Sequence, residues 1–275
     1  MAEVLQQRAE INDDDFSLNY TVSPNFRTLD FHAHDDYEIL YFLAGEVQYY
    51  IEDKSYYLMP GDILVIPPGK LHRPVMIDEF VTYERIVLMV APDYAGRLLA
   101  RAADNFFVQG GPSCRIPMSE KESGDLKQMM DSLLALRNNA VGLLERDSFC
   151  TLLLLRLHRL IEAAPAEEDA PRVRIQQVIH YINAHFTEPL LLEDIAERFY
   201  LSKYHLLRQF KAYTNSTVHN YILTKRVLLA KALLGQGIGP QEVSTACGFG
   251  SYAGFYQTFI RQTGKSPTNF IKEKE

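Results

Sequence analysis

The sequence contains no tryptophan and only three cysteines among its 275 residues. Cys114, Cys150 and Cys247 are far apart and odd in number, which argues against a disulfide framework and against the paired spacing of a structural zinc site. No stretch approaches the roughly 20 continuous apolar residues that a membrane-spanning helix requires. We therefore expect a protein of the reducing cytoplasm that has no membrane partner.

The charges are divided unevenly along the chain, whose net charge is −7. Residues 1–171 contain 15 Lys and Arg against 28 Asp and Glu, whereas residues 172–275 contain 13 against 7. A basic part joined to an acidic part is typical of a nucleic-acid-binding module that carries a module of another kind. Charge alone does not distinguish such a module from a domain with an ordinary basic surface in contact with solvent.

The first part of the chain has the pattern of short β-strands. Stretches rich in Tyr, Ile, Val and Phe are separated by turn formers such as Pro60-Gly61-Asp62 and Pro67-Pro68-Gly69. This spacing favours a sandwich or a small barrel over a parallel sheet. The predicted elements are strands at Asp36–Leu43, Glu46–Ile51, Ser55–Leu58, Asp62–Ile66 and Thr82–Val90, a helix at Pro92–Ala103 and a strand near Cys114–Met118.

Two amphipathic helices are predicted next, at Glu122–Arg137 and Leu143–Ala164. Their leucine-rich face exceeds what a small barrel could cover, and exposed apolar patches mark partner surfaces. We therefore expect residues 121–164 to mediate a homodimer. The acidic segment 165–171 begins and ends with proline and has no apolar period, which predicts an interdomain linker.

Residues 172–275 are predicted to be all-α and to repeat one design, at Leu191–Tyr213 and at Gln241–Thr263. Each repeat has a short helix, a tight turn, a Ser that can cap the next helix, and a longer helix. This is the arrangement of a helix-turn-helix, whose second helix enters the major groove of DNA. Between them, Thr217–Leu234 has no internal Gly or Pro and, at ~1.5 Å per residue, could hold two such helices about one DNA turn apart.

Apolar, small and basic residues recur at set positions in these repeats and in the helix between them. They are Ile195-Ala196, Leu201-Ser202, Leu206, Arg208, Phe210-Lys211, Arg226, Ala230, Leu233-Leu234, Val243, Ala246, Gly248-Phe249, Phe255, Phe259 and Gly264-x-Ser266-Pro267. This pattern resembles the AraC/XylS family of transcription regulators, and the resemblance covers residues 172–275 from end to end. Three residues depart from it: Asn215 stands where the family usually has Gly, Gly254 where it commonly has an aromatic residue, and Gln257 where it commonly has Arg.

The resemblance implies which residues contact DNA. Base contacts would be made by the outward face of the longer helix in each repeat, and the two basic residues Lys211 and Arg261 lie further along the same faces. The candidate DNA-binding residues are therefore Lys203, Tyr204, Leu207, Arg208 and Lys211 in the first repeat, and Tyr252, Ala253, Tyr256, Gln257 and Arg261 in the second.

A second resemblance lies in the first part of the chain. The strings His32-x-His34-x-x-x-Glu38-x-x-x-x-x-x-Gly45 and Gly61-x-x-x-x-x-Pro67-x-Gly69-x-x-His72 are similar to the two motifs of the cupin barrel. His32, His34 and Glu38 have the same parity, so a continuous extended strand would point all three to one face. With His72 they would form a set of three imidazoles and a carboxylate, which suits a divalent metal such as Fe, Mn, Zn or Ni.

A metal is one of two interpretations of these residues. In the sensor domains of such regulators, similar residues also line a ligand pocket or satisfy one another, so His32, His34, Glu38, His72 and Tyr41 are equally candidate ligand-binding residues. The dense tyrosines could stack against a sugar or could be barrel core with hydroxyl groups at the rim. The tyrosines in question are Tyr37, Tyr41, Tyr49, Tyr50, Tyr56 and Tyr57.

We therefore expect an α+β protein that is a transcription regulator and not an enzyme. Its partners would be an operator in double-stranded DNA, a small-molecule effector such as a carbohydrate, RNA polymerase and a second copy of the chain. The alternatives are a metal-dependent cupin enzyme with a DNA-binding tail, and an activator that needs no ligand. The expected domains are a cupin-type β-barrel (jelly roll) at 1–120, a helical dimerisation segment at 121–164, a linker at 165–171, and an AraC-type double helix-turn-helix domain at 172–275.

Overall fold

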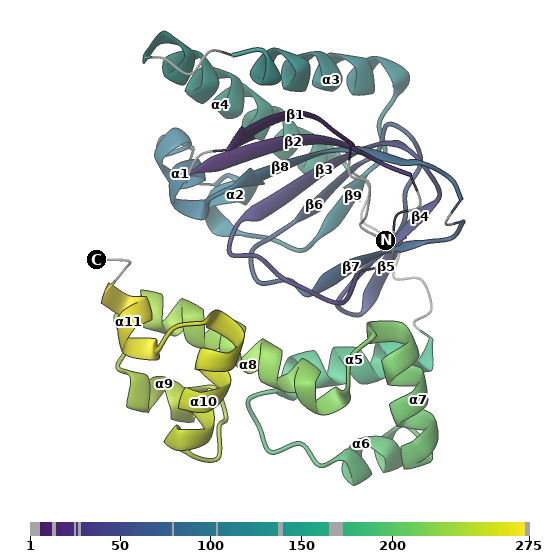
Figure 1. Cartoon of the computed structure of the whole chain (residues 1–275), viewed down its shortest axis with the longest axis vertical. Helices are drawn as coiled ribbons and strands as arrows, with labels where there is room; N and C mark the ends of the chain where they lie inside the picture. The colour runs from purple at the N-terminus through teal and green to yellow at the C-terminus, as the bar shows by residue number, and fades with distance from the viewer. Residues whose placement is uncertain are drawn as a thin grey trace. The chain divides into compact units, whose positions relative to one another are not determined.

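The computed structural model divides by its internal contacts into two units, Met1–Glu168 and Asp169–Glu275. Each unit has its own hydrophobic core. One unit combines strands with helices and the other is helical, which confirms the α+β prediction (Figure 1). The expected linker at 165–171 lies outside the described residues. None of the helices that the structure describes is long and apolar enough to cross a membrane. The structure describes residues 6–12, 15–24, 26, 29–78, 80–102, 104–136, 140–164 and 173–272.

Two antiparallel sheets form the barrel of the N-terminal unit. The larger has the strand order β1-β2-β8-β3-β6-β9 and the smaller has the order β5-β4-β7. The three strands that were not predicted from the sequence are β1, β2 and β7. The strands are β1 (Gln6–Asn12), β2 (Phe16–Ser23), β3 (Tyr37–Ala44), β4 (Val47–Ile51), β5 (Lys54–Tyr57), β6 (Ile63–Ile66), β7 (His72–Met76), β8 (Tyr83–Val90) and β9 (Cys114–Ile116).

Strand β3 lies between β8 and β6 and is buried on both of its faces. Leu40 and Phe42 point into the core between the two sheets. Ile39 and Tyr41 point the other way, into a second core beneath the helices. Alternate residues of an extended strand face opposite sides of its sheet, so a strand that serves two cores is apolar at nearly every position.

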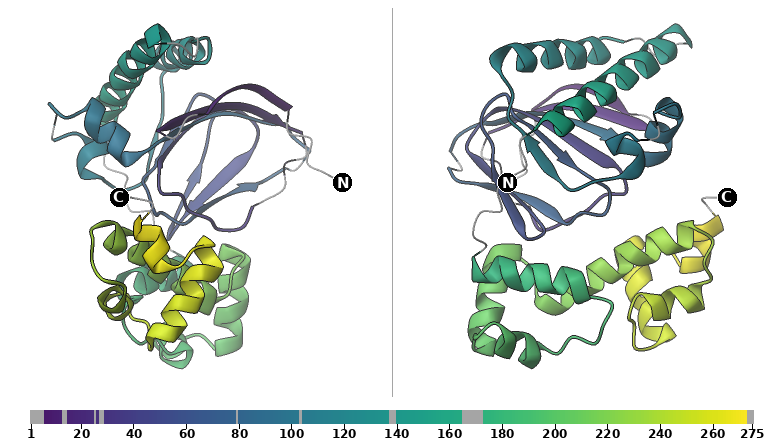
Figure 2. Two further views of the ribbon diagram at one scale, coloured as in Figure 1. Left: turned by 60° about the vertical axis from the view of Figure 1, so that its left-hand side comes forward. Right: turned by 180° about the vertical axis from the view of Figure 1, so that it is seen from behind.

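Four helices cover the outer face of the larger sheet (Figure 2). The predicted helix at Pro92–Ala103 ends early, at Leu98, and a short helix that was not predicted follows. Helix α3 starts at a capping box, in which the side chains of Ser119 and Glu122 each accept from the other residue's backbone N–H. The helices are α1 (Pro92–Leu98), α2 (Phe106–Gln109), α3 (Glu120–Leu134) and α4 (Ala140–Ala163).

The C-terminal unit is entirely helical over its described residues. Helices α7, α8 and α10 begin where the sequence places a capping hydroxyl: the side chains of Ser202, Thr217 and Ser251 each accept from a backbone N–H of the following helix. Helix α8 packs against α7, α9, α10 and α11 and so joins the two repeats. The helices are α5 (Arg174–His185), α6 (Leu192–Arg198), α7 (Lys203–Thr214), α8 (Val218–Gly235), α9 (Pro240–Ala246), α10 (Tyr252–Thr263) and α11 (Pro267–Lys272).

Candidate DNA-reading helices and a histidine cluster

The first helix-turn-helix unit consists of α6 and α7. Leu206 and Phe210 of α7 are fully buried against the rest of the unit. Ser202 accepts from the N–H of His205 at 3.2 Å, which fixes the start of α7. The opposite face of α7 is exposed, and it carries all five of the residues expected to contact DNA there: Lys203, Tyr204, Leu207, Arg208 and Lys211.

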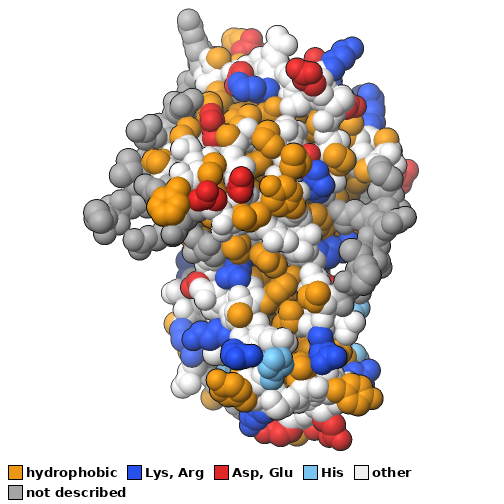
Figure 3. Space-filling model, turned by 90° about the vertical axis from the view of Figure 1, so that its right-hand side faces the viewer, with side chains coloured by type: hydrophobic (Ala, Val, Ile, Leu, Met, Phe, Trp, Pro, Cys, Tyr) orange, Lys and Arg blue, Asp and Glu red, His pale blue; other side chains and the backbone are white. Residues whose placement is uncertain are grey.

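The polar residues of this face are arranged around two contacts. Lys203 forms an ion pair with Glu193 of α6. The guanidinium of Arg208 lies 3.5 Å from Nδ1 of His205 and 6.0 Å from the centroid of the Tyr204 ring. Both interactions are at the protein surface, so they contribute little to stability and leave these side chains available to DNA. Several Lys and Arg side chains, with hydrophobic ones between them, lie on the C-terminal unit on the face shown in Figure 3.

The second unit, α9 and α10, repeats this geometry. Phe255 and Phe259 are fully buried on the inner face of α10. Ser251 accepts from the N–H of Gly254 at 3.2 Å. Of the five residues expected to contact DNA from this helix, Tyr252 is half-buried and packs on the ring of Phe255, with the centroids 5.9 Å apart. The other four, Ala253, Tyr256, Gln257 and Arg261, are exposed.

One prominent residue of the first helix-turn-helix unit was not among the functional residues predicted from the sequence. Tyr200, in the turn between α6 and α7, is 91% exposed and has a φ of 53°. A left-handed backbone is uncommon for a bulky residue. The sequence contains one signal for this left-handed backbone: the second helix-turn-helix unit has a glycine, Gly248, at the position that corresponds to Tyr200.

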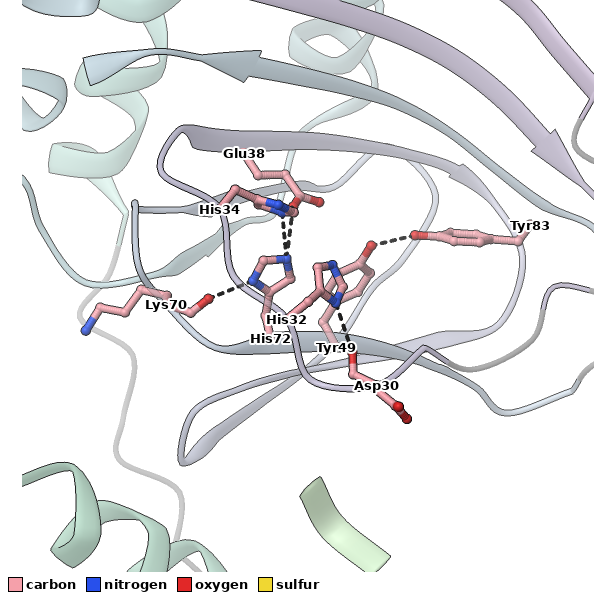
Figure 4. A network of polar contacts seen from close by, with 8 residues as sticks. All are labelled: Asp30, His32, His34, Glu38, Tyr49, Lys70, His72 and Tyr83. Carbon is pink, nitrogen blue, oxygen red and sulfur yellow. Dashed lines mark hydrogen bonds and ion pairs between the residues drawn. The ribbon is translucent and has the colours of Figure 1, made fainter. Parts of the chain in front are cut away.

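In the barrel, His32, His34, Glu38 and His72 lie close together (Figure 4). Nε2 of His34 is 2.8 Å from Oε2 of Glu38 and 3.2 Å from Nε2 of His72. The same carboxylate oxygen is 3.0 Å from Nε2 of His72. Glu38 and His72 are buried, whereas His32 and His34 are partly exposed. The four predicted residues therefore form one cluster that opens to solvent on the side of His32 and His34.

The cluster forms by a different route from the one expected. Strand β3 starts only at Tyr37, so no continuous extended strand carries His32, His34 and Glu38. His32 instead pairs with His72 in an isolated antiparallel bridge, with N–O distances of 3.0 and 2.9 Å. His72 begins β7, which pairs with β4 in the smaller sheet, so the segment before it crosses from one sheet to the other.

Hydrogen bonds fix the orientation of two of the rings. Nδ1 of His32 lies 2.9 Å from the carbonyl oxygen of Asp30, and Nδ1 of His72 lies 2.8 Å from that of Lys70. Because a carbonyl oxygen can only accept, each Nδ1 carries a proton. Nε2 of His72 then faces the Glu38 carboxylate, so His72 has an acceptor at each nitrogen, an arrangement that favours its protonated form.

The charges in the cluster agree with this assignment. Burial alone would raise the pKa of Glu38, but His72 and the hydrogen bonds from His34 and His72 hold that pKa well below its ordinary value. Burial would lower the pKa of His72, but the charge of Glu38 outweighs it and the pKa is raised. Burial and the neighbouring His72 lower the pKa of His32.

The donor set fits a divalent metal ion. One ligand nitrogen from each of His32, His34 and His72 can be chosen so that all lie within 4.8 Å of one another. The carbonyl groups at Nδ1 of His32 and His72 are the kind of second contact that orients metal-binding imidazoles. A metal would take the place of the Nε2 proton of His72. Glu38 would then either join the ligands or accept a hydrogen bond from an imidazole that does not bind the metal.

Tyr41 does not belong to this cluster. It lies on the opposite face of β3, and its hydroxyl group is 2.7 Å from Oγ of Ser123 in α3. Most of the other tyrosines are core residues too: Tyr37, Tyr49 and Tyr56 are buried, Tyr50 is half-buried, and only Tyr57 of the six is exposed. Tyr49 shares a hydrogen bond of 2.8 Å with Tyr83 between the sheets. The tyrosine-rich sequence therefore builds the barrel core.

Two family models match the chain. Residues 20–176, more than half of its length, match the AraC-like ligand binding domain. Residues 195–273 match a helix-turn-helix domain. The two matches fall on the parts of the chain that contain the histidine cluster and the two helix-turn-helix units.

Relatives with curated names are transcription regulators. The chain is 27% identical to the uncharacterized HTH-type transcriptional regulator YbfI of Bacillus subtilis, over 79% of this chain and 78% of that protein. It is 25% identical to LumQ, a probable transcriptional regulator of Photobacterium leiognathi, over 90% of this chain and 96% of that protein. It is 33% identical to the HTH-type transcriptional activator RhaS of Citrobacter koseri over 45% of this chain and 44% of that protein.

Proposed function

Because the chain belongs to the AraC family of transcriptional regulators, we propose that α7 and α10 read two half-sites of a DNA operator and that an effector bound at the histidine cluster controls this binding. The observation that carries the proposal is the exposed face of α7, where Lys203, Tyr204 and Arg208 stand together on a helix with a capped start. An Arg guanidinium on such a face can donate two hydrogen bonds to a guanine edge.

Selection of binding sites from random double-stranded DNA tests the first part of the proposal. The full chain should recover two half-sites whose centres are about one helical turn apart, because each reading helix occupies one major groove. Binding should weaken steeply as salt rises, since phosphate contacts release counterions. Recovery of no preferred sequence at low salt would contradict the assignment.

The effector is proposed to be a polar small molecule, a carbohydrate being the leading class. The cluster offers imidazole nitrogens and a carboxylate at an opening of the barrel, which suits hydroxyl groups as well as a metal ion. A thermal-shift screen over sugars, sugar acids and divalent metals separates these two occupants. A ligand at 100 times its dissociation constant stabilises the protein by ~2.7 kcal/mol.

His34 is the residue of choice for testing the site, because it is partly exposed and lies between Glu38 and His72. His34→Ala should abolish the thermal shift caused by the effector and the response of a reporter gene. The matched control is Tyr41→Phe, which removes a hydroxyl group from the other face of β3 and should leave the response intact. If His34→Ala responds normally, the effector binds elsewhere.

A homodimer is proposed to form through α4. Val141, Leu144 and Leu152 lie on one exposed face of this helix, and Leu144 is 71% exposed. Analytical ultracentrifugation at tens of micromolar should show a dimer for the wild type and a monomer for Leu144→Asp. The control is Leu143→Asp, on a different face of the same helix. A monomeric wild type, with and without effector, would contradict the proposal.

The output is proposed to be a change in transcription through contact with RNA polymerase. Its direction can be measured by transcription in vitro from a template that carries the selected operator upstream of a promoter. Addition of the purified chain should alter the amount of transcript, and the effector should alter it again. An unchanged transcript level with bound operator would exclude a direct effect on the polymerase.

A further inference from the structure

The loop between α5 and α6 is held from two sides by residues far along the chain. Arg226, on α8, donates from Nε to the carbonyl of Phe186 at 2.7 Å and from Nη2 to the carbonyl of Glu188 at 2.9 Å. The carbonyl between these two, that of Thr187, lies against the turn of the second helix-turn-helix unit. A Cβ added at Gly248 would be only 2.1 Å from the oxygen of Thr187 and 2.6 Å from its carbonyl carbon.

Three consecutive carbonyl groups of this loop are therefore contacted by the linking helix and by the second unit. The guanidinium of Arg226 also lies 5.9 Å from the centroid of Phe249, the residue after Gly248. Lys225 adds a contact with the ring of Phe186 at 5.7 Å. The loop leads directly into α6, so the first unit touches the turn of the second unit without passing through α8.

This contact adds to the packing of both helix-turn-helix units on α8. Packing on one helix leaves some freedom of rotation about its axis, because the contacts lie close to that axis. A connection away from that axis, such as Arg226 and Gly248 against residues 186–188, removes this freedom. Successive base pairs are ~3.4 Å apart along a strand, so a reader of two half-sites needs such rigidity to distinguish neighbouring spacings.

We infer that Arg226 is a positioning residue that fixes the relation between the two reading helices, and so makes the regulator accept half-sites at one spacing. The inference rests on the proposed reading of two half-sites by α7 and α10. Arg226 would contact neither base nor phosphate. Its planar guanidinium spans two carbonyl groups, which the single ammonium of lysine cannot do in the same geometry.

The experiment is a selection of binding sites with the full chain, followed by titration of operators whose half-sites are one base pair closer together or further apart. The wild type should recover one spacing and should lose at least about tenfold in affinity on the altered operators, as for a mismatched base pair. Arg226→Gln should recover the same half-sites at several spacings and should bind the altered operators nearly as well as the original. Lys231→Gln, which removes a charge from the same helix, is the control and should behave like the wild type.

Arg226→Lys keeps the charge on a single donor nitrogen, so it provides a folded variant if Arg226→Gln does not give a cooperative thermal transition. It too should recover several spacings. If Arg226→Lys melts like the wild type and still recovers a single spacing, the inference is overturned while the proposed function stands. If the wild type itself recovers no sequence, the proposed function fails, and the inference fails with it.

Discussion

The two helix-turn-helix units turn left-handed at corresponding places and carry different residues there. The turn residue is Tyr200 in the first unit, with a φ of 53°, and Gly248 in the second, with a φ of 78°. The residue that ends the longer helix is Asn215 in the first, with a φ of 54°, and Gly264 in the second, with a φ of 74°. Each unit thus turns left-handed twice, and only the second uses glycine for it.

The surroundings explain the difference at the turns. Tyr200 points into solvent, so its side chain meets no obstacle and the chain tolerates the backbone strain. Gly248 faces the Thr187 carbonyl at a distance that no side chain can occupy. A positive φ therefore favours glycine only modestly, whereas close contact with another backbone requires it.

Gly248→Ala should have the largest effect. The new methyl group would collide with a backbone carbonyl, so the C-terminal unit should lose at least ~3 kcal/mol of its free energy of unfolding. Urea denaturation measures the loss. Labelling of Cys247 is a local probe, because burial raises the pKa of this thiol to about 11 and should keep it unreactive in the wild type.

Gly264→Ala is the control for this substitution. Gly264 has nearly the same φ, but a Cβ there would have no neighbour within 4 Å. Its cost should be close to ~1 kcal/mol, the strain of the left-handed backbone alone. Equal losses for the two variants would show that strain, and not contact with Thr187, sets the requirement for glycine.

Substitutions on the reading helices should have the next largest effect, and each should act on one half-site. Arg208→Ala should cost ~1–3 kcal/mol of operator binding and relax the preference at one base position of the first half-site. Gln257→Ala should relax one position of the second half-site with a smaller loss, because no charge is removed. Quantitative titration with operators mutated in one half-site separates the two. Unchanged affinity and specificity for Arg208→Ala would remove α7 from the proposed interface.

Tyr200→Gly should have the smallest effect and the opposite sign. It removes a left-handed strain of ~1–2 kcal/mol but gives the unfolded chain more freedom, which costs ~0.5–1 kcal/mol. A net gain of about 0.5 kcal/mol in the free energy of unfolding should appear as a higher urea midpoint with an unchanged slope. A large loss would mean that the phenol ring makes a stabilising contact despite its exposure.

How far the sequence predicts the structure differs between the two parts of the chain. Helices α7, α8 and α10 start where they were expected, because the capping residues Ser202, Thr217 and Ser251 immediately precede them in the sequence. In the N-terminal unit, β2 and β7 went unpredicted, since they depend on partners distant in sequence: β2 pairs with β8, and β7 with β4.

The histidine cluster shows both the reach and the limit of sequence patterns. The motifs identified its four members, but not the bridge between His32 and His72 that brings them together, because bridge formation depends on how two sheets face each other. Tyr41, the fifth candidate ligand-binding residue, lies on the other face of β3 from the cluster, as its parity predicts. Tyr41 is three residues from Glu38 on one strand, so the two side chains must face opposite sides.

The contacts of Arg226 and Gly248 with residues 186–188 also affect how the C-terminal unit unfolds locally. Local unfolding of the second helix-turn-helix would remove the packing of Gly248 on the Thr187 carbonyl, and local unfolding of the first would pull the loop that leads into α6 away from Arg226 and Gly248. The two units should therefore open together, as one cooperative segment. In native-state hydrogen exchange, the amides in the middle of α7 and of α10 should exchange with the same free energy and the same dependence on urea.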